Sequence, residues 1–211
     1  MAAHSDIYVP VHYENLYLLS RYNWLTAGPV SISSQQWTHK FLTEHLPEML
    51  LAERSDAPLG IHTEYDTYSF RNQVVSTLHQ HYPSIGFLSS PYHLRSHDER
   101  LKEWCSHKTH WISPVLNDAP TRIFDALVTG GVPIVPSSLR FMPPVNAIPR
   151  GHIAFYSPLD IVNPKEVVDR ANKLFDEGGR DGIVIRHRLA LQHGDARLRQ
   201  MLGFAIEVLG I

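Results

Sequence analysis

The chain has 211 residues, of which 43% are hydrophobic and 19% are charged, a composition typical of globular proteins. Its formal net charge of −2 argues against a protein that binds nucleic acid through a basic surplus, although a local basic patch remains compatible. A single cysteine, Cys105, excludes an internal disulfide framework and fits a reducing compartment. No apolar run reaches the roughly 18 residues of a membrane-spanning helix, and residues 1–10 lack the pattern of a signal peptide. The expected location is therefore cytoplasmic.

Residues 1–58 differ from the rest of the chain by their many aromatic side chains and by the absence of strand-like alternation. The aromatic residues of this part include Tyr8, Tyr13, Tyr17, Tyr22, Trp24 and Trp37. Apolar residues at helical spacing predict one helix over about 35–53. We interpret residues 1–58 as a helical and looping lead-in that packs on the main domain, residues 59–211. So short a segment cannot bury all of its aromatic surface alone, which favours a partner such as a second copy of the chain.

From Leu59 onward, short apolar strands alternate with helices, a pattern typical of parallel sheets covered by helices. Strands are predicted at 59–62, 85–88, 110–112, 132–135 and 153–156. Helices are predicted at 70–81, 97–106, about 118–129, 165–177, 183–192 and 196–209. The predicted fold class is therefore α/β, with a doubly wound, largely parallel sheet and the helical aromatic lead-in before it.

In such a sheet, ligands bind at the carboxyl ends of the strands, and several polar residues are placed there. His62 ends the first strand and is a candidate acid, base or phosphate contact, or alternatively a loop residue bonded to backbone. Glu64 follows it as a candidate base or sugar-hydroxyl ligand, or alternatively as a solvated carboxylate that caps the next helix. Ser137 and Arg140 follow the strand at 132–135, where Arg140 is a candidate phosphate contact or an ordinary surface arginine.

Between two of these strand ends, residues 113–140 predict a loop, a helix, a tight turn and a buried strand. Asn117 and Asp118 are expected to cap the helix, and a helix N-terminus suits a phosphate. Arg122 adds a planar cation with several donors at this end. Asp125 lies three residues further on the same face, where its carboxylate can accept hydrogen bonds from sugar hydroxyls.

The run Thr-Arg-Ile-Phe-Asp-Ala-Leu-Val-Thr-Gly-Gly-Val-Pro-Ile-Val, from Thr121 to Val135, resembles the donor-site segment of glycosyltransferases with the GT-B fold. Such segments combine an acidic residue near the helix start with a later Gly-x-Pro and a strand. The resemblance implies a Rossmann-like donor-binding domain in which Asp125 holds the ribose of a nucleotide sugar. Asn117 stands where the family often has a second acidic residue, and Thr121 and Arg122 belong to the same donor site. More loosely, the resemblance extends from Leu59 to the C-terminus.

The predicted function is transfer of a sugar from a nucleotide-activated donor to an acceptor, with His62 and Glu64 as candidate catalytic residues. Arg122 and the helix start are expected to stabilise the departing nucleoside phosphate without a cofactor. The 14 histidines include no His-Glu-x-x-His pattern, so no metal site is predicted.

A complete GT-B enzyme has two such domains, so the acceptor half is expected on another chain or from a dimer partner. The alternative function is a noncatalytic module that binds a nucleotide sugar or a protein. A further alternative is a phosphate-handling α/β enzyme, such as an epimerase, that uses the same site.

Overall fold

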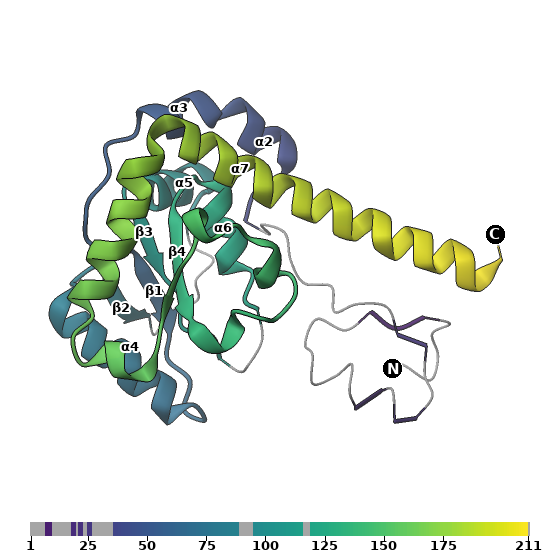
Figure 1. Ribbon diagram of the computed structural model, residues 1–211, viewed down its shortest axis with the longest axis horizontal. Coiled ribbons are helices and arrows are strands. Elements are labelled where there is room, and N and C mark those ends of the chain that lie inside the picture. The colour runs from purple at the N-terminus through teal and green to yellow at the C-terminus, as the bar shows by residue number, and fades with distance from the viewer. Residues whose placement is uncertain are drawn as a thin grey trace.

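The computed structural model describes residues 7–9, 18–19, 21–22, 25–26, 36–88, 95–115 and 119–210, without the side chains of 192–197. Within these residues the chain has a mixed α/β fold in which short parallel strands alternate with helices (Figure 1). The strands are β1 (Gly60–Thr63), β2 (Ile85–Leu88), β3 (Thr109–Trp111), β4 (Val132–Pro136) and β5 (Ala154–Tyr156). The expected alternation of strands and helices is therefore confirmed.

The strands form two small parallel sheets, one of β1 and β2 and one in the order β3-β4-β5. A parallel bridge between Leu59 and His110 connects them. In this bridge the Leu59 amide donates to the Thr109 carbonyl at 2.9 Å, and the Trp111 amide donates to the Leu59 carbonyl at 2.8 Å. Because all of these pairings are parallel, the carboxyl ends of the strands lie at the same edge.

The helices of the described part are α2 (His39–Glu44), α3 (Leu46–Leu51), α4 (Ser69–His81), α5 (His97–Cys105), α6 (Arg122–Val128) and α7 (Lys165–Leu209). The helix expected over 35–53 is divided into α2 and α3. The division lies at His45, whose φ of −94° and ψ of 2° are not those of an α-helix. Pro47 explains it, since proline has no amide hydrogen to continue α2 but fits the first turn of a new helix.

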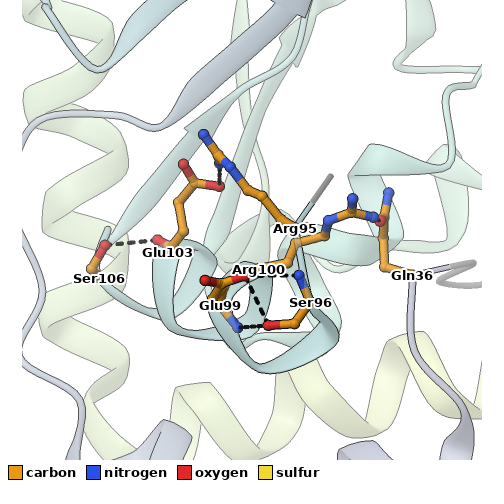
Figure 2. Close-up of polar contacts among 7 residues, drawn as sticks. All are labelled: Gln36, Arg95, Ser96, Glu99, Arg100, Glu103 and Ser106. Atoms are coloured by element: carbon orange, nitrogen blue, oxygen red, sulfur yellow. Dashed lines mark hydrogen bonds and ion pairs between the residues drawn. The ribbon is translucent and has the colours of Figure 1, made fainter. Parts of the chain in front are cut away.

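Helix α5 begins with a capping box, which Figure 2 shows. The Ser96 hydroxyl accepts a hydrogen bond from the Glu99 amide at 3.2 Å, and the Glu99 carboxylate accepts one from the Ser96 amide at 2.8 Å. These bonds to Ser96 lower the pKa of Glu99 from its ordinary value. On the same helix, the Arg100 guanidinium donates to the side-chain oxygen of Gln36, which precedes α2. This contact connects the lead-in with α5.

Buried apolar side chains form two clusters, and β4 contributes to both. Val135 belongs to the cluster that contains the apolar residues of α5 and α6, whereas Ile134 belongs to the cluster of α4 and the first part of α7. Neighbouring residues of a strand point to opposite faces, so helices pack against both sides of β4.

Helix α7 is interrupted at Gly179, whose φ of 51° and ψ of −147° are not helical. The expected end of the helix that starts at Lys165 is therefore confirmed as a break. The helices predicted at 183–192 and 196–209 instead form one continuous second part, which extends away from the strands (Figure 1). No helix in the described part of the chain, α7 included, combines the length and apolarity needed to span a membrane.

One aromatic ring connects the lead-in with α7. The guanidinium carbon of Arg54 lies 5.2 Å from the centre of the Phe175 ring, and that of Arg186 lies 5.0 Å from it. Arg54 donates to the carbonyl of Thr129 at 2.8 Å, and Arg186 donates to that of Gly130 at 2.7 Å. Burial, together with the charge of Arg54, lowers the pKa of Arg186 to about 10. Both arginines thus bind the turn between α6 and β4.

Candidate functional site

A cavity of about 500 Å³ lies at the carboxyl edge, bordered by residues that follow β3, β4 and β5 and by the start of α4. Its wall includes the polar side chains of Arg71, Ser113, Ser137, Ser138 and Tyr156. Its apolar lining includes Phe70, Val74, Pro114, Val115 and Ile161. The size and the mixture of apolar walls with a few polar groups are those of small-molecule sites.

Two arginines converge on His62 beside this cavity. His62 lies on β1 and is 1% exposed, and its Nδ1 is 3.4 Å from Nη2 of Arg71 and 3.4 Å from Nη1 of Arg122. Guanidinium groups only donate hydrogen bonds, so Nδ1 is the acceptor and the ring proton lies on Nε2. Burial and the charges of Arg122 and Arg71 hold the pKa of His62 well below its ordinary value. The imidazole is therefore neutral at pH 7.

The two arginines that contact His62 come from different helices. Arg71, in the first turn of α4, is 8% exposed and donates to the carbonyls of Thr63 at 2.7 Å and Ser113 at 3.4 Å, where β1 and β3 end. Arg122 is the first residue of α6, and its guanidinium carbon lies 5.7 Å from the centre of the Trp104 ring. We call Arg71 and Arg122 the arginine pair.

The arginine pair is not neutralised within the described residues, because neither member forms an ion pair with a carboxylate there. Burial lowers the pKa of Arg71 from its ordinary value, and the charge of Arg122 contributes in the same direction. Arg71 lines the cavity and Arg122 lies behind it at His62, and two neighbouring cations of this kind are suited to bind an anion.

The expectations for residues 117–125 have different outcomes. Helix α6 begins at Arg122, and its N-cap is Thr121, which makes no side-chain capping bond. The predicted cap by Asn117 or Asp118 is therefore wrong, since the helix starts later; both residues lie outside the described part. Asp125 is 0% exposed and packs within α6, away from the wall of the cavity.

The remaining predicted site residues are divided between two places. Ser137 lines the cavity beside the arginine pair. Glu64 is exposed in the loop after β1 and does not line it. Arg140 lies at a second cavity of about 590 Å³, with its guanidinium carbon 4.9 Å from the centre of the Phe155 ring. The structure thus brings His62 and Arg122 together, places Ser137 in the cavity that Arg71 also lines, and places Arg140 elsewhere.

Two residues of the cavity were not identified as ligand contacts from the sequence. Arg71 stands in the first turn of the helix after β1, a position that directs its side chain to the carboxyl edge. Tyr156 ends β5, and its hydroxyl donates to the Ile112 carbonyl at 3.4 Å. Burial raises the pKa of Tyr156 to about 12, so its hydroxyl stays protonated and keeps this bond. For Tyr156, the position at a strand end was a signal in the sequence; Arg71 offered none.

Among the described residues, no group of three or more His, Cys, Asp or Glu side chains is arranged to hold a metal ion. Cys105 is 5% exposed, and burial raises the pKa of its thiol to about 11. No protein-family model matches the chain, and no curated protein or solved structure is significantly similar to it.

Proposed function

We propose that the chain binds a nucleotide-activated sugar and forms the donor-binding half of a glycosyltransferase, built on a doubly wound, Rossmann-like sheet. The arginine pair holds the phosphate groups, and the neighbouring cavity receives the sugar or the base. One observation carries the proposal: two guanidinium groups lie 3.4 Å from one neutral imidazole at the carboxyl edge. The resemblance of residues 121–135 to a GT-B donor segment gives this anion site its nucleotide-sugar interpretation.

The arginine pair supplies the electrostatic part of glycosyl transfer. When the bond between the sugar carbon and the phosphate oxygen breaks, negative charge grows on the departing nucleoside diphosphate. Arg71 and Arg122 donate hydrogen bonds to that charge, and Arg71 is held in advance by its two carbonyl partners.

A bound diphosphate also changes His62. Burial is the main cause of the low pKa of His62, and the charges of Arg122 and Arg71 add to it. The negative charge of the diphosphate offsets the contribution of the arginines, so that pKa rises in part. To act as the general base for an acceptor hydroxyl, His62 needs its Nδ1 released from the arginine pair, which follows if the guanidinium groups turn to the diphosphate. Glu64, exposed in the loop after β1, is the second candidate base. An acceptor domain on another chain, or a second copy of this chain, completes the enzyme.

Replacing Arg122 with alanine should weaken binding of a nucleoside diphosphate by about 1.5–3 kcal/mol, because a charge-assisted hydrogen bond is lost. Binding of the corresponding nucleoside should change little. Calorimetric titration of the protein with UDP, ADP and GDP, and separately with the corresponding nucleosides, measures both effects. Arg180→Ala is the matched control, since Arg180 is exposed on α7 and lines neither cavity. Equal losses for diphosphate and nucleoside would show that Arg122 does not contact phosphate.

The second candidate function is a noncatalytic nucleotide-sugar-binding module. It is favoured by the exposed position of Glu64 outside the cavity, since a carboxylate base has to reach the reacting atoms. Slow hydrolysis of the bound donor distinguishes the two functions. A glycosyltransferase releases free sugar from the nucleotide sugar in the absence of acceptor, and the release should fall in Arg122→Ala. A module that only binds leaves the donor intact.

A further inference from the structure

The second cavity, of about 590 Å³, lies beside β5, the outer strand of the sheet β3-β4-β5. Its wall is formed by the segment 140–155 and by the first part of α7. It shares no lining residue with the cavity beside the arginine pair. This β5-edge cavity is therefore a separate site, independent of the proposed nucleotide-sugar function.

Three arginines line the β5-edge cavity: Arg140, Arg150 and Arg170. The described residues of its wall include no Asp or Glu side chain, and none of the three arginines takes part in an ion pair of the described part. The charge of Arg170 lowers the pKa of Asp160, but the Asp160 carboxylate already accepts hydrogen bonds from the amide and hydroxyl of Ser157. The cavity thus keeps a positive surplus.

The arginines differ in how they are held. Arg170 donates to the carbonyl of Phe155 at 3.0 Å, and the guanidinium of Arg140 stacks over the ring of the same residue, 4.9 Å from its centre. Both are therefore positioned before any ligand arrives, and each retains unused donors. Arg150 is exposed and has no side-chain hydrogen bond in the described part of the chain, so it is free to move onto a ligand.

Apart from Asn146, the rest of the wall is apolar. Val145 and Ile153 are 1% and 3% exposed, and Leu174 lies one helical turn from Arg170 on the same face of α7. Phe141, also part of the wall, is 83% exposed, an unusual position for a large apolar side chain. A ligand body that covers Phe141 would remove this apolar surface from water.

We propose that the β5-edge cavity binds an amphipathic phosphate monoester, with the phosphate on the three arginines and the apolar body against Phe141 and its neighbours. A phosphate monoester fits because it carries up to two negative charges and three oxygen acceptors, which match several guanidinium groups at once. The apolar wall requires a hydrophobic substituent, and the volume lies in the range of sites for small organic molecules.

Titration with n-octyl phosphate, below its micelle concentration, tests the proposal on the whole chain by calorimetry. Octyl phosphate should bind at least about tenfold more tightly than inorganic phosphate and than uncharged n-octyl glucoside, because each of these lacks one half of the interaction. Equal binding of inorganic phosphate would overturn the amphipathic part of the proposal, and equal binding of octyl glucoside would overturn the anionic part. Absence of octyl phosphate binding would overturn the whole.

Single-residue variants test whether octyl phosphate binds in the β5-edge cavity. Arg150→Gln should weaken octyl phosphate by about tenfold without lowering stability, since Arg150 has no side-chain partner to lose. Arg140→Gln should weaken it similarly, whereas Arg180→Gln, on the exposed side of α7, should not change it. Arg122→Ala should leave octyl phosphate binding intact while it weakens nucleoside diphosphates, which separates the two sites. Unchanged binding in both Arg140→Gln and Arg150→Gln would place the ligand elsewhere and refute the proposal.

Discussion

Replacing Gly130 with alanine should lower the free energy of unfolding by about 2–4 kcal/mol, because backbone strain and steric overlap add at this position. Gly130 has a φ of +80°, in the left-handed region that alanine rarely adopts. An added Cβ would lie 2.4 Å from Cγ2 of Ile183 and 3.2 Å from its Cβ. Ile183 is a 5% exposed residue of α7, so it has little room to move. Urea unfolding measures the change.

The control for this effect is Gly203→Ala in the extended part of α7. Gly203 has no positive φ, and an added Cβ there meets no atom within 4 Å. Alanine should therefore leave the protein equally stable or stabilise it by up to about 1 kcal/mol. Combining Gly130→Ala with Ile183→Ala should cost less than the sum of the two single changes, because the second removes atoms that overlap with the first. Strict additivity, or equal stability of the two glycine variants, would contradict this explanation.

Stability should fall by about 3 kcal/mol between pH 6.5 and pH 5, because two buried histidines remain neutral in the folded state. Burial lowers the pKa of His62 and of His110 well below the ordinary value. Below the unfolded-state pKa of about 6.5, the unfolded chain takes up protons that the folded chain does not. Acid therefore favours unfolding, and the stability is fully present above this pH. Urea unfolding at several pH values measures the slope.

Replacing His110 tests whether buried neutral histidines cause the loss of stability in acid, and it leaves the arginine pair undisturbed. Its ring stacks on Trp104 with centres 4.8 Å apart, and neither of its nitrogens has a hydrogen-bond partner among the residues that the structure describes. His110→Leu keeps an apolar group of similar size and should remove roughly half of the loss between pH 6.5 and pH 5. His81→Gln, at the exposed end of α4, should keep the whole loss. An unchanged slope in His110→Leu would mean that other groups cause the acid sensitivity.

The strand positions could be predicted from the sequence because each strand is a short apolar run between loop residues, and the carboxyl edge follows from parallel pairing. That reasoning placed His62 and Ser137 near the site. The role of Arg71 could not be predicted, since its hydrogen bonds join the ends of two strands that meet only in the folded chain.

Helix α6 shows a second limit to what the sequence can predict. Helical spacing correctly puts Arg122 and Asp125 near one another, but every residue from Ile123 to Val128 is buried. When all sides of a helix are covered, periodicity does not reveal which side faces a ligand.

The contact of Arg54 and Arg186 with Phe175 affects how the molecule comes apart. These arginines, one before β1 and one in α7, hold consecutive carbonyls of the turn at Thr129 and Gly130. Opening of the lead-in therefore exposes the Phe175 ring and releases a carbonyl in the centre of the chain. We therefore expect the segment that contains Arg54 to unfold together with the strands that follow it, as one cooperative unit, although the sequence pattern changes near residue 58.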